Sequence, residues 1–549
     1  MLKVVLVAVN SRFSHMNPAL YSIYDYVDGH LAPELRKDFD IVIREFNINQ
    51  DRHDVRAALL HERADLYLFS CYIWNISYID HLLSYLGQSL PEASLIGGGP
   101  EIQHDIKEEY LRQKHWDFLM PGDGEVEVLD ILNRLTGETT PKELKVFWKK
   151  LRQDKSYLDV LDLKADRKTV DMDKLPFYYP NYRDTLSHKI VTYESSRACP
   201  FRCSYCVSSL EGRPRFKRLD RVYKELDYFL LFINWPFFDF FEEAIPLVKF
   251  LDRSSNFPAD RSFKIFSYLI DKAKVKETYP CFHFELEASL LDEATVELLE
   301  KAPQDLFQFE IGVQSIHEET LKRVNRHPMR EKDYAYLNRL IKAQRQHIHL
   351  DLIAGLPGET LDQLESSFNK LWQLQPDMLQ LGHLKLLRGT GVREDAIRLG
   401  YGFNLQPPYE VYRSDAMRAE EIILTEQVAH MTDVYPNKGL LKDSMDFLLK
   451  HTDLSPFRML AELFTYYRAW QGESFRSLSL DETLFVYLDY LLSEWPELFK
   501  EGLEIFKKDF ENDRKSGSLA WSKVVQKLGQ SGKINTKLYT FCKEAESHD

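Results

Sequence analysis

Three cysteines lie within eight residues of the chain, at Cys199, Cys203 and Cys206, directly after a short apolar run typical of a strand. Thiolates with the spacing Cys-x-x-x-Cys-x-x-Cys can hold three irons of a [4Fe–4S] cube and leave the fourth iron without a protein ligand. An open coordination position is what a catalytic metal centre needs. The alternatives are a zinc site or ordinary buried thiols. Zinc requires a fourth Cys or His at a matching spacing, and the nearest downstream residues, Cys281 and His283, are remote in sequence.

At these residues the chain resembles the radical S-adenosylmethionine (SAM) superfamily, whose signature has an aromatic residue before the third cysteine, here Tyr205. The resemblance implies that the amino and carboxylate groups of SAM chelate the fourth iron. It also implies that one electron from the cluster cleaves the sulfonium and releases a 5′-deoxyadenosyl radical. Tyr205 is therefore expected beside SAM.

Six strand patterns alternate with helical patterns between residues 189 and 395. Six β/α units fit the partial barrel of this superfamily, in which chemistry gathers at the carboxyl ends of the strands. The expected strands are Ile190–Glu194, Leu247–Asp252, Phe282–Glu287, Phe307–Gly312, His347–Ile353 and Met378–Leu384.

The second of these strands lacks the Gly-Gly-Glu that the resemblance implies against the SAM amino group. Asp252 and Arg253 stand there instead. The Asp252 carboxylate can accept hydrogen bonds from an ammonium group. The alternative is an Asp–Arg pair that caps the next helix.

Carboxylates mark the third strand, where alternation puts Glu285 and Glu287 on one face. Two buried carboxylates are costly unless they meet hydroxyls, cations or water. The ribose and ammonium groups of SAM are such partners, and salt bridges toward helices are the alternative.

The fourth and fifth strands carry further matches. The run from Glu310 to Ser315 resembles a Glu-x-Gly-x-Gln-Ser stretch of the superfamily, and the run from Asp351 to Glu359 resembles its Asp-x-Ile-x-Gly-x-Pro-Gly-Glu. The resemblance implies that Glu310, Gln314 and Asp351 lie near SAM.

Residues 1–140 alternate short apolar strands with helical segments, which predicts a doubly wound, Rossmann-like parallel sheet. Ligands of such sheets bind beyond the carboxyl ends of the strands. The expected strands are Lys3–Val9, Asp40–Phe46, Leu66–Cys71, Ser94–Gly97 and Asp117–Met120.

Two glycine-rich loops and one aromatic loop follow the last three of these strands. Glycine lets the backbone approach a bulky ligand, although tight turns alone are the alternative. A sheet with such loops, placed before a radical SAM segment, resembles the cobalamin-binding domain of cobalamin-dependent radical SAM proteins. The resemblance assigns these residues to cobalamin: Ser70, Tyr72, Trp74, Asn75, Gly97, Gly98, Gly99, Pro100, Glu101, Gly122, Asp123, Gly124 and Glu125.

The loop after the first strand departs from this family. Many cobalamin domains carry Asp-x-His-x-x-Gly there, and its histidine binds cobalt. Here His15 lacks both flanking residues. It is either a cobalt ligand or a loop histidine near the corrin.

The remaining segments are less informative. Residues 141–188 look charged and irregular and are expected to form a linker. Extra aromatic residues near 231–246 suggest burial against another domain or subunit. Residues 396–549 look helical and resemble an uncharacterised subgroup of these proteins, so a cap on the barrel that shapes the substrate cavity is expected.

Composition indicates which partners and which cellular compartment to expect for the protein. The formal net charge of −14 over 549 residues argues against a dedicated nucleic-acid binder. Six cysteines, half of them read as metal thiolates, suit a reducing cytosol, and Cys71, Cys281 and Cys542 are expected to be incidental thiols. The N-terminus lacks a secretory layout, and polar residues break the apolar stretch Tyr228–Phe241. A cytoplasmic protein without a membrane span is expected.

These observations predict a radical SAM enzyme with a [4Fe–4S] cluster, SAM and cobalamin. The expected reaction is methylation of an unactivated carbon in an unknown small-molecule or peptide substrate. Flavodoxin or ferredoxin would supply electrons. The alternatives are a cobalamin-dependent rearrangement or ring formation, and a cobalamin or redox sensor without turnover. The acidic balance and the lack of an RNA-binding appendage weaken a role in transfer-RNA modification.

Overall fold

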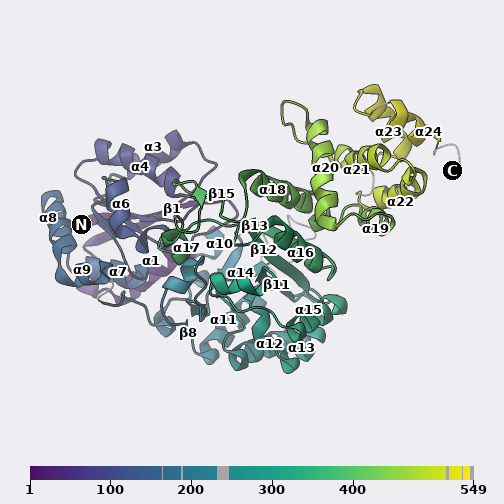
Figure 1. Cartoon of the computed structure of the whole chain (residues 1–549). Helices are drawn as coiled ribbons and strands as arrows, with labels where there is room; N and C mark the ends of the chain where they lie inside the picture. The colour runs from purple at the N-terminus through teal and green to yellow at the C-terminus, as the bar shows by residue number, and fades with distance from the viewer. Residues whose placement is uncertain (163–164, 187–188, 232–246, 515–518, 535, 545–549) are drawn as a thin grey trace.

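The computed structural model describes residues 1–162, 165–186, 189–231, 247–514, 519–534 and 536–544. Figure 1 shows an N-terminal α/β unit, a second α/β unit that contains the cysteines, and a run of helices at the C-terminal end. The fold class expected from the sequence is confirmed.

The N-terminal unit is built on five parallel strands in the order β2-β1-β3-β4-β5. This is a doubly wound arrangement whose strand order reverses beside β1. All five expected strands are present. They are β1 (Leu2–Asn10), β2 (Phe39–Asn47), β3 (Leu66–Ser70), β4 (Ser94–Gly98) and β5 (Phe118–Leu119).

Helices cover both faces of this sheet because its strands are apolar on both faces. Alternate residues of β1 enter two separate cores: Val4 and Leu6 join α1 and α7, whereas Val5 and Val7 join α3 and α4. The helices are α1 (Pro18–His30), α2 (Pro33–Arg36), α3 (Arg52–Glu62), α4 (Ile76–Ser89), α5 (Pro100–Gln103), α6 (Ile106–Arg112) and α7 (Gly124–Leu132).

Residues 141–188 are expected from the sequence to form an irregular linker. They begin with two helices, α8 (Pro141–Gln153) and α9 (Lys155–Leu161), so the expectation is wrong for this part. Thr140 caps α8 in a reciprocal pair with Glu143. Trp148 is buried in the N-terminal core and donates to Ser94 Oγ at 2.8 Å. A charged outer face had hidden an amphipathic helix. After α9 the chain is largely irregular as far as α10 (Arg183–Leu186).

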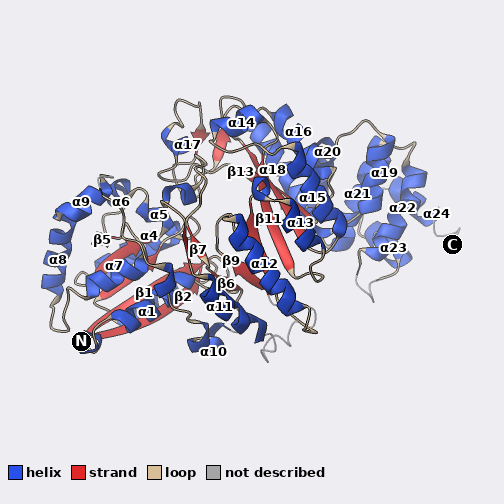
Figure 2. Cartoon of the chain, turned by 90° about the horizontal axis from the view of Figure 1, so that it is seen from below, coloured by secondary structure: helices blue, strands red, loops and turns tan. Residues whose placement is uncertain are grey.

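The second unit is an open parallel sheet of six strands in the order β13-β12-β11-β10-β9-β6. All six expected strands are present (Figure 2). They are β6 (Val191–Tyr193), β9 (Leu247–Phe250), β10 (Cys281–Leu286), β11 (Phe307–Gln314), β12 (His347–Ala354) and β13 (Met378–His383). Residues 232–246, which hold the aromatic insertion, lie outside the described residues.

One face of this sheet is apolar and the other is polar. Phe307 and Phe309 of β11 join the helix-covered core, while Gln308 between them and Glu310 beyond them lie on the other face. The covering helices are α11 (Leu219–Leu231), α12 (Ala259–Ala273), α13 (Glu293–Glu300), α14 (Glu318–Arg323), α15 (Glu331–Ala343) and α16 (Leu361–Trp372). Short antiparallel pairs join β7 (Ser196–Arg197) to β8 (Arg215–Phe216) and β14 (Gly402–Phe403) to β15 (Val411–Arg413).

The C-terminal segment is helical, as expected. After α17 (Gly391–Glu394) come α18 (Ala419–Val434), α19 (Lys442–His451), α20 (Pro456–Gln471), α21 (Leu480–Glu494), α22 (Phe499–Asn512), α23 (Trp521–Gln530) and α24 (Thr536–Glu544). Ser455 caps α20 ahead of Pro456, and its hydroxyl donates to Glu365 of α16 at 2.7 Å. The segment therefore packs on the barrel, and its last helices extend away from it (Figure 1). Among the described residues, no helix has both the length and the apolar character to span a bilayer.

Candidate functional site

The cysteine loop leaves the carboxyl end of β6, where Asp252 holds its first residues. Asp252 is buried and accepts hydrogen bonds from the backbone amides of Ser195 and Ser196, at 2.7 and 3.0 Å, and from the Ser195 hydroxyl. Ala198, immediately before the first cysteine, has a φ of 73°, which turns the chain sharply at this point. These contacts favour a positioning role for Asp252 over contact with SAM.

Backbone hydrogen bonds from distant segments fix the rest of the loop. The amide of Ser204 donates to Val324 at 2.9 Å, and the amide of Val392 donates to Ser204 at 3.1 Å. Asn325 donates to the carbonyl of Arg202 at 2.9 Å. Together with Asp252, three separate parts of the chain thus hold the loop that carries the cysteines.

The three thiols are free and stand apart. Cys203 is buried and Cys199 and Cys206 are half-buried. Within the described part of the chain, only one group brings three metal-ligand atoms within 4.8 Å of one another, and it contains no cysteine. Thiolates on one zinc ion lie about 3.8 Å apart. This spacing argues against the zinc alternative, whereas thiolates on different irons of one cube need no such approach.

Arg326 joins the cysteine loop to the barrel. Its guanidinium lies 3.8 Å from Cys203 Sγ, donates to Glu287 Oε2 at 2.7 Å, and donates to the carbonyl of Gly312. Burial raises the pKa of the Cys203 thiol, and the Arg326 charge opposes that rise. No local pattern marked Arg326, because it acts through residues far away in sequence.

Protein partners already engage several of the residues expected near SAM. Glu285 pairs with Arg253 at 2.6 Å, and Glu287 pairs with Arg326. Tyr205 packs against a small apolar cluster beside the loop. Gln314 differs: its backbone φ is 69°, and its buried Oε1 has no hydrogen-bond partner among the described residues. Gln314 and Asp351, whose Oδ1 is also buried and without a partner among the described residues, are the expected SAM residues with an open acceptor.

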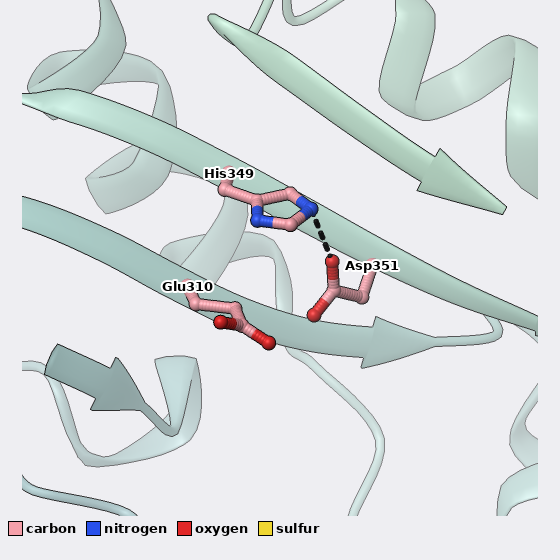
Figure 3. A group of neighbouring side chains, drawn as sticks. All are labelled: Glu310, His349 and Asp351. Atoms are coloured by element: carbon pink, nitrogen blue, oxygen red, sulfur yellow. Dashed lines mark ion pairs between the residues drawn. The ribbon is translucent and has the colours of Figure 1, made fainter. Parts of the chain in front are cut away.

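Glu310 and Asp351 lie beside two histidines: His349, which no sequence pattern indicated, and His283, which the sequence offered only as a remote zinc ligand. His349 Nε2 is 2.7 Å from Asp351 Oδ1 (Figure 3). His283 Nε2 is 3.2 Å from Glu310 Oε2. His283 lowers the pKa of Glu310 to about 2, against the opposing effect of burial. Glu310 is therefore a carboxylate at neutral pH.

A cavity of about 590 Å³ lies between the N-terminal sheet and the barrel. This volume falls within the range of small-molecule and cofactor sites. Ten of the thirteen residues expected to cradle cobalamin line it: Ser70, Tyr72, Trp74, Gly98, Gly99, Pro100, Gly122, Asp123, Gly124 and Glu125. Barrel residues including Lys249 and Arg253 form the opposite wall, and no residue beyond Arg253 is part of the lining. The C-terminal helices therefore do not line this cavity, and their expected role in shaping a substrate cavity stays a prediction.

The other three expected residues serve the fold. Asn75 is buried and donates to the carbonyls of Val9 and Ser70 at 3.0 Å. Gly97 packs inside the N-terminal core. Glu101 lies 3.6 Å from Arg388 and accepts a hydrogen bond from Tyr409, in the segment that follows the barrel.

Packing inside the protein explains the glycines of the loops. A Cβ on Gly99, where φ is 104°, would lie 2.7 Å from the Cys71 carbonyl, and a Cβ on Gly122 would lie 2.5 Å from the Lys168 carbonyl. Close packing inside the protein therefore explains these glycines without a bound ligand. What favours a ligand is the lining of the cavity as a whole.

The cavity wall contains buried polar atoms without partners. Asn17 Oδ1 and Thr192 Oγ1, from opposite walls, have no hydrogen-bond partner among the described residues. Buried polar groups normally find one. His15 also lines the cavity, and burial together with the Arg12 charge lowers its pKa, which leaves a neutral imidazole that can bind a metal.

Charged residues of the loop after β5 form ion pairs that connect the N-terminal unit to the unit that contains the cysteines. Arg197 of β7 lies 3.1 Å from Glu125 and 3.3 Å from Asp123, and Arg215 of β8 lies 2.8 Å from Asp123. Burial alone would raise the pKa of Asp123, but the two arginines outweigh it and lower that pKa. These carboxylates connect the cavity wall directly to the strand before the cysteine loop.

Glu359, at the loop after β12, gives the site a pH-dependent component. Its side chain is fully buried, accepts from the Ser315 hydroxyl, and has a pKa raised by burial to about 8. Between pH 4.5 and 8 the folded state holds a proton that the unfolded state releases, so stability falls as pH rises through this range.

Replacing Glu359 with glutamine should remove this dependence, because the amide is neutral throughout. Relative to the wild type, Glu359→Gln should gain up to ~5 kcal/mol between pH 4.5 and 8. Urea denaturation of the cluster-free protein across this range measures the change. Glu297→Gln, at an exposed side chain, is the control and should leave the profile unchanged. Parallel profiles for the wild type and Glu359→Gln would contradict the prediction.

The chain matches two family models. Residues 193–371 match the radical SAM superfamily and form a radical SAM domain, a class of domain that uses a [4Fe–4S] cluster and SAM. Residues 398–543 match a protein of unknown function (DUF4080).

Curated relatives match over part of their length. Ribosomal protein uS12 methylthiotransferase RimO from Chlamydia pneumoniae is 27% identical over 173 residues, which are 31% of this chain and 36% of that protein. RimO from Chlamydia abortus is 28% identical over 178 residues, 32% of this chain and 37% of that protein. The chain thus spans about a third of the length of these relatives.

Solved structures share the fold more widely. The cobalamin-dependent SAM radical enzyme OxsB, with aqua-cobalamin and SAM bound, has a TM-score of 0.56 at 12% identity and covers 100% of this chain and 84% of its own. The radical SAM methyltransferase TsrM from Kitasatospora setae, with cobalamin and a [4Fe–4S] cluster bound, has a TM-score of 0.54 at 13% identity, with coverages of 93% and 99%. At these identities the likeness shows a shared fold.

Proposed function

We propose that this protein is a cobalamin-dependent radical SAM enzyme that methylates an unactivated carbon of its substrate. The observation that carries the proposal is the cavity between the N-terminal sheet and the barrel, whose walls hold ten of the residues expected for cobalamin. The cavity adjoins the strands that lead into the cysteine loop. Solved proteins of the same fold are described with cobalamin and a cluster bound.

Each part of the chain has a task in this proposal. Cys199, Cys203 and Cys206 hold the iron of the cluster as thiolates, and Arg326 offsets the charge at Cys203. Gln314 presents an open acceptor to SAM. Asn17 and Thr192 would present open polar atoms to a bound corrinoid, and the neutral imidazole of His15 would be a candidate cobalt ligand. When bound, the cluster and SAM supply a 5′-deoxyadenosyl radical, and cobalamin supplies the methyl group.

Anaerobic purification with cobalamin present tests the proposal, followed by corrinoid and iron quantification and a reductive assay with SAM. We expect one corrinoid per chain, a full cluster, and formation of 5′-deoxyadenosine. A full cluster without corrinoid would overturn the role of cobalamin. A full cluster that never cleaves SAM would instead support a sensor.

Trp74 gives a sharper test of the cavity. Its ring is 46% exposed, lines the cavity and stacks on Tyr72 at 4.3 Å between centroids. Trp74→Ala should lower cobalamin retention several-fold, since such an aromatic contact contributes about 1 kcal/mol. Tyr412→Ala, at a ring of similar exposure on β15, should not change retention. Equal cobalamin retention by the two variants would show that the corrin does not bind against Trp74.

A second candidate is methylthiolation, which is the activity that the name of the RimO relatives states. It is favoured by the sequence match over about a third of the chain. Mass analysis of the product distinguishes the two, because methylthiolation adds sulfur and methylation does not.

A further inference from the structure

The inner face of the barrel carries a group of side chains that the proposed function does not use. Glu310 of β11 and His349 and Asp351 of β12 bring one ligand atom each within 4.8 Å of one another. In Figure 3 the two carboxylates, from neighbouring strands, lie on the same side of the His349 ring. The register of the sheet explains this, because Glu310 is paired with His349 and Asp351 follows two residues later on the same face.

The polar atoms of this group lack the hydrogen bonds that burial demands. His349 is 6% exposed, and its Nε2 has no partner with acceptable hydrogen-bond geometry, although Asp351 Oδ1 lies only 2.7 Å away. Asp351 Oδ1 is likewise buried and unsatisfied. A ring nitrogen and a carboxylate oxygen that are buried side by side, with hydrogen-bonding capacity unfilled, are groups that can bind a cation in common.

Among the described residues, one lysine and no arginine lies within 4.0 Å of the Glu310 or Asp351 carboxylate. Glu310 and Asp351 supply two carboxylates, and Lys249 is the nearest cation, with Nζ 3.8 Å from Glu310 Oε2. This distance is too long for a hydrogen bond. Glu285 does not draw on Lys249, because it pairs with Arg253. The other groups that can carry positive charge against these carboxylates are His283 and His349.

We propose that Glu310, His349 and Asp351 bind a divalent transition-metal ion inside the barrel. Imidazole with carboxylates suits Zn²⁺, Fe²⁺ or Mn²⁺. Tetrahedral ligands about 2.1 Å from one ion lie about 3.4 Å apart, so atoms that lie within 4.8 Å of one another would close by up to about 1.4 Å to share it. His283, beside Glu310, orients that carboxylate from outside the ligand set. Three protein ligands leave an open position for water or a polar group of the substrate.

This assignment moves Glu310 and Asp351 away from SAM, and it stands independently of the proposed function. The cluster cysteines and the cavity between the units contribute no ligand to it. Metal binding and SAM cleavage can therefore fail separately.

The test uses the cluster-loaded protein under anaerobic conditions with Mn²⁺ as the probe. The electron paramagnetic resonance signal of free Mn²⁺ reports uptake. We expect one Mn²⁺ per chain, displaced by Zn²⁺, with iron content unchanged. Glu310→Gln and His349→Ala should each weaken uptake at least ~10-fold.

The matched control is His383→Asn on the neighbouring strand β13, where Nε2 lies 2.9 Å from Thr425 Oγ1. It should leave uptake unchanged. Thermal unfolding verifies that each variant is folded, and if His349→Ala is not, Glu310→Gln decides the question. Absence of stoichiometric uptake by the wild type, or equal uptake by wild type and Glu310→Gln, would overturn the metal site. Formation of 5′-deoxyadenosine in the same preparation reports separately on the proposed function.

Discussion

Replacing Cys203 with alanine should abolish reductive SAM cleavage and most of the bound iron. Cys203 is the buried member of the three cysteines and the one that Arg326 approaches. In the Cys203→Ala variant only two thiolates would hold the cube, and the iron that Cys203 would bind loses its protein ligand. The expected fall in 5′-deoxyadenosine formation exceeds ~100-fold, because even partners outside the ligand shell contribute 10–100-fold. Iron and sulfide quantification beside the SAM assay measures both effects.

Cys281→Ala is the matched control, since Cys281 is also a free thiol but begins β10 rather than the loop. It should retain the cluster and activity. Retention of iron and turnover in Cys203→Ala would remove the cluster from this loop. Zinc in place of iron in the wild type would have the same consequence.

Loss of Arg326 should cost the fold about 3–5 kcal/mol, because the methionine variant leaves Glu287 as a buried charge without its partner. The two side chains are 12% and 7% exposed and lie 2.7 Å apart. Urea denaturation of the cluster-free Arg326→Met variant measures the loss.

The double variant Arg326→Met with Glu287→Met provides the control for this pair. Replacing both partners by apolar groups of similar size is often neutral or stabilising, so most of the lost stability should return. A single variant that loses less than about 1 kcal/mol would show that the pair is solvated rather than buried.

The repeating elements could be predicted from the sequence because their signals are local. The apolar run Leu2–Asn10 and the alternating run Phe307–Gln314 each carry their own pattern, and both form the expected strands. The helix Pro141–Gln153 was missed although Thr140 and Glu143 form a capping box, since charge on its outer face outweighed that signal.

The contacts between units could not be predicted in the same way. Arg197, Arg326 and Arg388 each bind partners that lie tens to hundreds of residues away. The sequence contains these residues but not their pairing, which the assembled fold decides. His349 was missed for a different reason: its spacing from Asp351 was visible, but its neighbour Glu310 lies on another strand.

The N-terminal unit is fastened to the rest of the chain at two well-separated places. Arg197 and Arg215 bind the loop after β5, and Arg388, only 2% exposed, binds Glu109 at 2.6 Å behind the loop after β4. A hinge that opened the cavity would have to strip one of these desolvated charges of its counterion. A bulky cofactor such as cobalamin is therefore expected to bind while the two α/β units assemble and to stay bound through many turnovers. Only small reactants are expected to exchange with solvent.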